Sequence, residues 1–200
     1  THPMIKAMNY MQYDSMSLGN HEFNFGLGLI EKIRNDANFP LLSANTYKKA
    51  DGTNLVDAYK IKEVKGVKVG VLGLTIPHVP MWDGAKVESL EFRSLREEAK
   101  KQVRILKDVE QVDVIVAAIH AGLKNSDPEA AAENVINEVP EIDAFVIGHD
   151  HKEVAQKMAD YTGKEKPVGA AKDTGTGVVK IELELNKPDT KWEVTGSSVE

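Results

Sequence analysis

The sequence contains no cysteine among its 200 residues. Disulfides, iron–sulfur clusters and thiolate zinc sites are therefore excluded, and any metal site must use nitrogen and oxygen ligands. No hydrophobic run approaches the length of a membrane-spanning helix, so we expect no membrane span. The chain begins with THPMIKAM and not with an initiator Met, so it reads as cut or processed, and the lack of a signal peptide carries little weight.

Positive charge is also scarce. The net charge is −6, and no basic tract is long enough to hold a nucleic-acid backbone. Nucleic-acid polymers are therefore not expected as partners, and a small anionic substrate would need a local positive charge such as a metal ion. With 42% hydrophobic and 28% charged residues, the chain is expected to fold as one domain or one large piece of a longer protein.

Several catalytic and nucleotide-binding motifs are absent. The sequence has no Walker A motif and no Gly-X-Ser-X-Gly element, which argues against a P-loop nucleotide site and a serine-hydrolase elbow. The segment GLGLIEK contains only two of the glycines that a dinucleotide fingerprint needs, so it supports a Rossmann site weakly.

Hydrophobic periodicity predicts an α/β core followed by a β-rich tail from about Pro167. Helices are predicted at 3–13, 27–34 and 95–106 and from 127 onward, and strands at 14–18, 39–47, 59–74 (a hairpin), 112–120 and 142–151. Ser94 with Glu97 suggests a capping box, and Asp127-Pro128 a helix start. The segments YTGKEKPVG and KDTGTG are predicted to be surface loops.

Four of the six histidines lie at or just past the ends of predicted strands: His21, His120, His149 and His151. The carboxyl ends of parallel strands meet at one edge of a sheet, where ligands bind, so we expect these imidazoles and the neighbouring Asn20 to lie close together. Imidazole and amide oxygen suit zinc, manganese or iron. An ordinary loop histidine is the simpler explanation of any one of them, but that explanation weakens when four share one position.

The remaining histidines, His2 and His78, share no such position and are assigned to the surface. Trp82, in the segment VPMWDG, is interpreted as a loop packing residue and not as a platform for a substrate.

The segments GNHE (residues 19–22) and GHDH (residues 148–151), with His120 after an apolar strand between them, resemble the calcineurin-like metallophosphoesterases in order and spacing. GNHEFNFGL and IPHVPMWDG are most similar to the branch of bacterial 5′-nucleotidases and 2′,3′-cyclic nucleotide 2′-phosphodiesterase/3′-nucleotidases. The resemblance covers essentially the whole chain and implies a two-sheet sandwich flanked by helices.

The resemblance also implies roles for individual residues. Asn20, His120 and His149 would be ligands of one metal ion, and His151 a ligand of a second. His21 would sit over the phosphate and stabilise or protonate the leaving oxygen. The adjacent Glu22 matches a variable position and is given no chemical role.

The sequence departs from the family's pattern in two ways. Asn24 stands where the 5′-nucleotidase pattern has an Asp paired with the catalytic histidine, and it is typical of the cyclic-phosphodiesterase branch. The family's opening Asp-X-His and Gly-Asp motifs are also absent, as is its C-terminal nucleotide-binding domain. Residues 1–200 are therefore expected to be a partial catalytic domain without its first strands, exposing an apolar edge and holding one metal ion or none where the intact domain holds two.

These features predict an enzyme that hydrolyses phosphate esters of nucleotides or cyclic nucleotides, with His21 and Asn24 as catalytic residues. The 2′,3′-cyclic nucleotide 2′-phosphodiesterase/3′-nucleotidase reaction is favoured, and 5′-nucleotidase activity is the alternative. A non-catalytic remnant of the fold that binds a ligand or partner remains open. By resemblance alone, we expect an extracytoplasmic protein that is secreted, periplasmic or bound to the cell wall.

Overall fold

A computed structural model describes residues 2–200. The helices and helical turns are α1 (Pro3–Tyr10), η1 (Asn20–Phe23), α2 (Leu27–Asp36), α3 (Val79–Asp83), η2 (Gly84–Val87), α4 (Leu95–Arg104), η3 (Ile105–Val109), η4 (Pro128–Ala130), α5 (Ala132–Glu138) and η5 (Asp173–Gly175). The strands are β1 (Met16–Ser17), β2 (Leu41–Leu42), β3 (Thr46–Lys48), β4 (Tyr59–Val64), β5 (Val67–Thr75), β6 (Leu90–Phe92), β7 (Val114–His120), β8 (Ala144–Ile147), β9 (Val154–Ala159), β10 (Glu165–Ala170), β11 (Ile181–Asn186) and β12 (Glu193–Val199).

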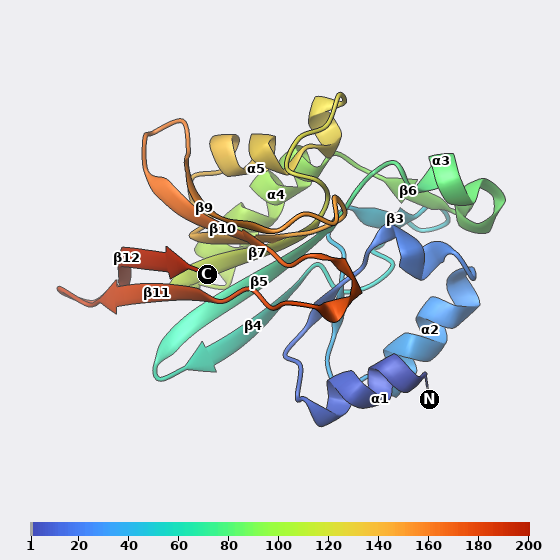
Figure 1. Cartoon of the computed structure of the whole chain (residues 1–200), viewed down its shortest axis with the longest axis horizontal. Helices are drawn as coiled ribbons and strands as arrows, with labels where there is room; N and C mark the ends of the chain where they lie inside the picture. The colour runs from blue at the N-terminus through green and yellow to red at the C-terminus, as the bar shows by residue number, and fades with distance from the viewer. Residues whose placement is uncertain (1) are drawn as a thin grey trace.

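A six-stranded sheet in the order β4-β5-β7-β8-β10-β9 forms the centre of the molecule (Figure 1). Strands β5, β7, β8 and β10 are parallel, and the edge strands β4 and β9 run antiparallel to their neighbours. The predicted hairpin at 59–74 is confirmed as β4 and β5. Its turn residues Lys65 and Gly66 have φ of 51° and 81°, the left-handed pair that a tight hairpin turn requires.

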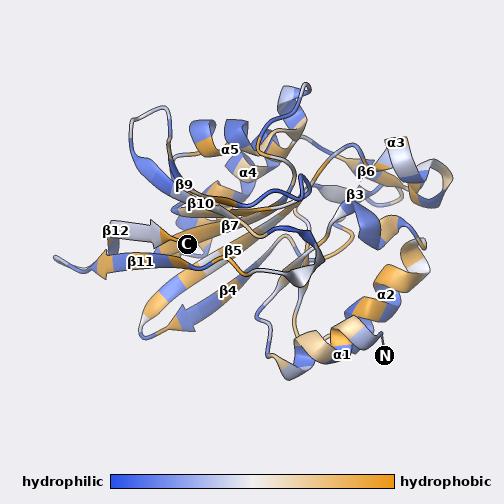
Figure 2. Ribbon diagram, viewed as in Figure 1, coloured by the Kyte–Doolittle hydropathy of each residue, from blue (hydrophilic) through white to orange (hydrophobic). Residues whose placement is uncertain are grey.

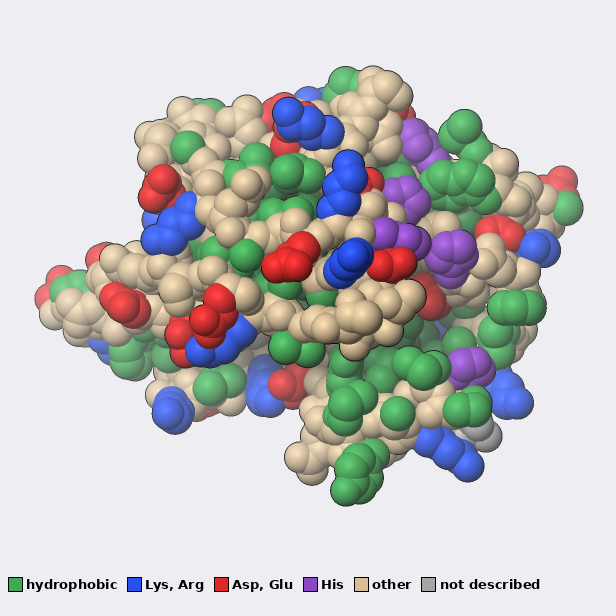
Figure 3. All heavy atoms as spheres, in the orientation of Figure 1, with side chains coloured by type: hydrophobic (Ala, Val, Ile, Leu, Met, Phe, Trp, Pro, Cys, Tyr) green, Lys and Arg blue, Asp and Glu red, His purple; other side chains and the backbone are tan. Residues whose placement is uncertain are grey.

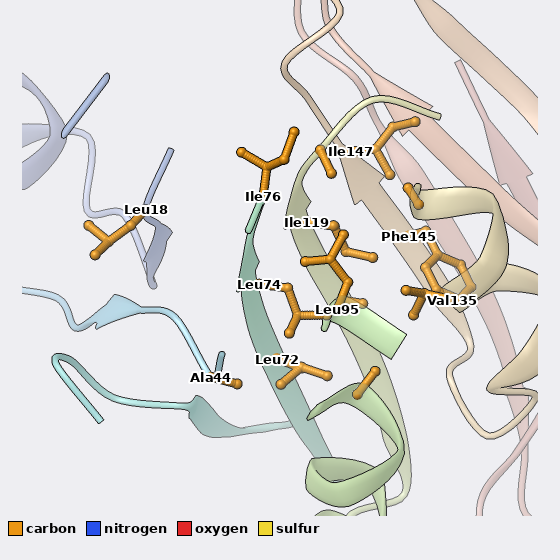
Figure 4. Close-up of a cluster of buried hydrophobic side chains, with 14 of the residues drawn as sticks. Leu18, Ala44, Leu72, Leu74, Ile76, Leu95, Ile119, Val135, Phe145 and Ile147 are labelled. Carbon is orange, nitrogen blue, oxygen red and sulfur yellow. The ribbon is translucent and has the colours of Figure 1, made fainter. Parts of the chain in front are cut away.

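Helices cover one face of this sheet. Helix α4 packs on β5 and α5 packs beside α4 (Figure 1). Figure 4 shows the core between these layers, where Leu95, Val135 and Phe145 lie among the side chains of the inner strands. In Figure 2 the inner strands β5 and β7 are largely hydrophobic, whereas β4 alternates between hydrophobic and hydrophilic residues. Strands buried on both faces require the continuous apolar pattern, and strands with one solvated face require the alternating one.

Two small sheets lie on the opposite face. The parallel pair β1-β2 packs on β5, and Leu42 approaches Gly73 so closely that a Cβ there would collide with it. The antiparallel pair β11-β12 packs on β10, where Val179 leaves no room for a Cβ at Gly169. The expected α/β fold, with a central sheet, flanking helices and a β-rich end, is confirmed. The tail from about Pro167 was expected to extend a second sheet, and β11 and β12 do form a separate two-stranded sheet, whereas β10 joins the large sheet.

The structure corrects the sequence-based elements around residue 160. Residues 154–159 form β9, which was not predicted, because most of its side chains are exposed and show no apolar alternation. The segment YTGKEKPVG was expected to be a surface loop, but its second half belongs to β10. Lys166 in this strand is only 1% exposed and donates to the carbonyl of Pro140 at 2.6 Å.

Two helix boundaries also differ from expectation. Ser94 caps α4 by accepting from the Glu97 amide at 3.2 Å, as predicted, but the helix ends in the π turn η3 and not at Leu106. Asp127 caps a short 3₁₀ turn, η4, and α5 begins separately at Ala132. Within residues 2–200, every helix is too short or too polar to cross a lipid bilayer.

Candidate active site

The predicted site lies at the carboxyl ends of the parallel strands. His120 is the last residue of β7 and is paired in register with Thr75 at the end of β5. His149 follows two residues after β8, which runs beside β7. Figure 3 shows histidine side chains gathered in a band on this part of the surface, next to a hydrophobic patch. The topology therefore brings together imidazoles that are far apart in the sequence.

A tight 3₁₀ turn, η1, delivers Asn20 to the same point. Phe23 anchors the turn in the core, where its ring meets that of Phe92 at 5.3 Å. Glu22 closes the turn, because its Oε2 accepts from the amide of Gly19 at 2.6 Å. No chemical role was expected of Glu22, and in the structure it holds the turn together.

The absence of a side chain at residue 19 allows β7 to approach this turn. A Cβ at Gly19 would lie 2.8 Å from Cε1 of His120 and 2.9 Å from Oε2 of Glu22. The backbone there has φ of −96°, which any residue adopts. Gly19 is therefore required by close packing on the His120 ring and not by its conformation.

Three of the four predicted metal ligands converge. The Oδ1 atom of Asn20, which is buried, lies 2.8 Å from Nε2 of His120 and 3.2 Å from Nδ1 of His149. The two imidazole rings meet edge to face, with centroids 5.4 Å apart. We call Asn20, His120 and His149 the amide–imidazole cluster.

Burial keeps both imidazoles of this cluster neutral. Burial, with additional lowering by the nearby His149, His21 and His151, brings the pKa of His120 from 6.5 down to about 4. Burial also lowers the pKa of His149, against an opposing effect of the Asp150 carboxylate. Because a metal binds the unprotonated imidazole, these lowered pKa values leave both rings ready for a cation at neutral pH.

The fourth predicted ligand, His151, is placed differently. Its side chain is 62% exposed, and its Nδ1 lies 3.7 Å from Oδ2 of Asp173 in the η5 turn. His149 and His151 both have a left-handed backbone, with φ of 77° and 54°. Such conformations are uncommon for residues other than glycine and are concentrated at functional sites.

The predicted catalytic pair, His21 and Asn24, is in direct contact. Nδ1 of His21 lies 2.7 Å from Oδ1 of Asn24 at the exposed end of η1. The Nδ2 of Asn24 donates to Oδ2 of Asp83 at 2.8 Å, and Lys86 donates to the other oxygen of this carboxylate at 2.9 Å. Sequence reasoning missed Asp83 because it lies 59 residues from Asn24, with no pattern linking the two.

His78 and Trp82 also border the site, which corrects their interpretation. His78 follows β5 by three residues and is not a free surface group, because its Nε2 lies 2.8 Å from Oδ2 of Asp127. Trp82 lies on α3 and not in a loop. Its ring is 6.5 Å from that of His78 and 5.6 Å from that of His149, and it is 50% exposed. The position of His78 just after the strand β5 is the sequence feature that could have placed it at the site.

The amide–imidazole cluster fits one divalent ion. It offers an amide oxygen and two neutral imidazoles from three separate segments, a donor set that suits zinc, manganese or iron. Among residues 2–200, no group of three or more His, Cys, Asp or Glu side chains is arranged to hold a metal ion. The cluster therefore has no carboxylate of its own to offset the charge of a second cation.

Comparison with known proteins agrees with this geometry. The calcineurin-like phosphoesterase family model matches residues 3–153. The chain is 32% identical to the trifunctional nucleotide phosphoesterase protein YfkN of Bacillus subtilis, over 98% of the chain but 15% of that protein. It is 30% identical to a 2′,3′-cyclic-nucleotide 2′-phosphodiesterase/3′-nucleotidase of Salmonella typhimurium and 36% identical to a 5′-nucleotidase of Vibrio cholerae, covering 100% and 89% of the chain.

The chain spans 34% of each of these last two proteins, so it corresponds to about a third of their length or less. The crystal structure of the calcineurin-like phosphoesterase YfkN from Bacillus subtilis superimposes with a TM-score of 0.90 at 30% identity, over the whole of this chain and 66% of that one. The match of family model, sequence and fold establishes that the chain belongs to the calcineurin-like phosphoesterases.

Proposed function

We propose that the protein carrying this chain hydrolyses phosphate esters of nucleotides in a metal-dependent reaction. The favoured reaction is that of a 2′,3′-cyclic nucleotide 2′-phosphodiesterase/3′-nucleotidase. The observation that carries the proposal is the convergence of Asn20, His120 and His149 on one point from three segments. The relatives' names support the substrate class, because they include both cyclic-nucleotide phosphodiesterases and nucleotidases.

In this proposal the amide–imidazole cluster holds a divalent ion. A bound ion would polarise a phosphate oxygen and activate water at neutral pH, and neutralising developing charge is usually the largest contribution to such catalysis. Asn20, His120 and His149 bind and orient it. His151, on the exposed loop beside Asp173, is proposed to contribute to a second ion in the intact protein.

His21 is proposed to act on the leaving group. Its Nδ1 is engaged by Asn24, so the second ring nitrogen, Nε2, is left to face the solvent-accessible side of the site. There it would take up a proton and deliver it to the sugar oxygen as the phosphorus–oxygen bond breaks. The adjacent Asn20 faces inward, so one turn separates the group that holds the ion from the group that meets the substrate.

The test is an assay of the full-length natural protein with 2′,3′-cyclic AMP, 3′-AMP and 5′-AMP, with and without a chelator. We expect turnover of the first two substrates and its loss when metal is removed. The His21→Ala variant should lose most turnover, and the matched control is His2→Ala, because His2 is exposed and accepts from the Met4 amide at the start of α1. Activity that survives thorough metal removal would overturn the proposal.

A second candidate is 5′-nucleotidase activity, favoured by the 36% identity to the enzyme of Vibrio cholerae. Turnover of 5′-AMP alone would establish it in place of the cyclic-nucleotide reaction. Binding of nucleotide without turnover of any substrate would instead support a non-catalytic binding domain.

We also propose an extracytoplasmic location, supported by the resemblance to nucleotidases, one of which, from Thermus thermophilus, is named as a precursor. Fractionation of cells that express the natural gene would test it.

A further inference from the structure

Asp83 is a buried carboxylate next to the catalytic turn. It is the last residue of α3, and its side chain is 2% exposed. Its two oxygens are used separately. Oδ2 accepts from Nδ2 of Asn24 at 2.8 Å, and Oδ1 accepts from Nζ of Lys86 at 2.9 Å. Asn24 in turn contacts His21 at 2.7 Å. A continuous chain of hydrogen bonds therefore joins Lys86 to the imidazole.

The donors and acceptors in this chain have one consistent arrangement. An ionised carboxylate only accepts, so Asp83 must face the amide nitrogen of Asn24. The amide oxygen of Asn24 then faces His21, and because this oxygen only accepts, the Nδ1 of His21 must carry the hydrogen. The Nε2 atom is thereby left as the ring nitrogen available to the reaction. Without Asp83, no partner would determine whether the oxygen or the NH₂ group of the Asn24 amide faces His21.

Asp83 is charged under ordinary conditions. The hydrogen bond from Lys86 lowers its pKa, with a further lowering by the bond from Asn24, and these outweigh the effect of burial. A negative charge thus lies two hydrogen bonds from His21.

We propose that Asp83 is the positioning residue for His21, acting through Asn24 to fix the imidazole tautomer and to supply the negative charge that a neutral Asn24 lacks. This inference rests on the proposed role of His21 at the phosphate. The negative charge therefore lies one hydrogen bond beyond Asn24 and comes from the end of α3.

The isosteric variant Asp83→Asn gives a specific expectation. Lys86 only donates, so it should hold the new amide oxygen and leave the new NH₂ group facing Asn24. The Asn24 amide should then turn over and present its own NH₂ to Nδ1 of His21. The hydrogen of His21 should consequently move from Nδ1 to Nε2. The kcat should fall roughly 10–100-fold with little change in KM, as is typical when the partner of an active-site group is lost.

The double variant Asn24→Asp/Asp83→Asn should reverse this change. The new carboxylate at 24 would accept from Nδ1–H of His21, and the new amide at 83 would donate to that carboxylate while accepting from Lys86. The hydrogen should return to Nδ1, and kcat should recover most of its loss. A residue that only supports the fold would give no such recovery.

The experiment uses full-length protein labelled with ¹⁵N in its histidines, and nitrogen–proton correlation spectra report which ring nitrogen of His21 carries the hydrogen. Asp14→Asn is the matched control, since Asp14 is exposed and pairs only with Lys62. Nδ1–H in the wild type and double variant and Nε2–H in Asp83→Asn support the proposal. An unchanged tautomer in Asp83→Asn, or no recovery in the double variant, would overturn it. The spectra report the tautomer of His21 without any substrate turnover. The result is therefore independent of the outcome of the nucleotidase assay.

Discussion

The histidines of the site differ in how firmly the fold holds them. His120 and His149 share the Oδ1 of a buried Asn20, and burial lowers the pKa of both. The side chain of His151 is 62% exposed, and its Nδ1 lies 3.7 Å from Oδ2 of Asp173. His120 ends β7 and His149 lies two residues after β8, whereas His151 lies two residues farther along the same loop. A metal-binding side chain close to the end of a paired strand has a well-defined position, whereas one on an exposed loop is held less rigidly.

This difference supports the proposal that the amide–imidazole cluster holds one metal ion and that His151 lies outside this position. Two dications lie roughly 3.5–4 Å apart in dinuclear sites and repel each other strongly unless anionic ligands lie between them. The amide–imidazole cluster contains neutral groups only. The chain is therefore expected to hold one ion at the cluster, and the following changes test that expectation in order of decreasing effect.

The largest effect is expected from His149→Ala. Removing one imidazole from the amide–imidazole cluster should weaken Mn²⁺ or Zn²⁺ binding by more than the roughly 10–100-fold lost when a partner of a ligand is removed. His21→Ala should spare metal binding, because its ring is engaged by Asn24. Calorimetric titration of both variants measures the two affinities. An empty metal site in His21→Ala would show that the division between ligand and catalyst is wrong.

The next largest effect is expected in the free energy of unfolding of the metal-free protein and in how it depends on pH. His120 has a folded pKa of about 4 against 6.5 when unfolded, so between these values the unfolded chain binds the extra proton. Stability is therefore retained above pH 6.5 and lost as pH falls toward 4, by about 2 kcal/mol on reaching pH 5.

Urea unfolding at pH 7.5 and pH 5, in chelator, measures this loss. The control is His120→Gln, which has no titrating ring and should lose less stability over the same interval. An equal loss in both proteins would mean that His120 is not held neutral by the fold.

A smaller effect is expected from Gly19→Ala. The added methyl group would lie 2.8 Å from Cε1 of His120, so the ring or the turn must shift, at a cost of roughly 1–3 kcal/mol. The free energy of unfolding and the metal affinity should both fall. Gly28→Ala is the matched control, because nothing lies within 4 Å of its added Cβ. Equal effects of the two substitutions would contradict the close packing of β7 on η1.

The smallest effect on the first ion is expected from His151→Ala. This side chain is largely exposed and lies outside the amide–imidazole cluster. The affinity of the isolated chain for one ion should therefore stay within about threefold, well below the change typical of a lost ligand partner. A loss as large as that of His149→Ala would place His151 among the ligands of the first ion.

The sequence predicted the inner strands because buried parallel strands have a distinctive apolar pattern, although β8 ends at Ile147 and not at the predicted residue 151. The residues that precede His120 and His149 carry that pattern, and β7 and β8 follow it. Strand β9 was missed because it lies at an edge, with side chains in water. Lys166 was assigned to a loop because lysine is seldom buried. Its charge is accommodated by the Pro140 carbonyl and by Asp160 at 3.6 Å, partners that only the fold brings together.

The site was predicted in part for the same reason. Residues placed by strand order could be grouped from sequence, but Asp83 and Trp82 approach from α3, whose position depends on how the segment after β5 turns back over the sheet edge. Contacts between such segments have no periodicity that sequence reasoning can detect.

The central claim is tested most directly by calorimetric titration of the 200-residue chain with Mn²⁺ or Zn²⁺ at pH 7.5, alongside His149→Ala. The structure predicts one ion per chain in the wild type, bound weakly, and no measurable binding in the variant. Two tightly bound ions per chain, or equal binding by the variant, would contradict the conclusion that Asn20, His120 and His149 form the one metal position built by these residues.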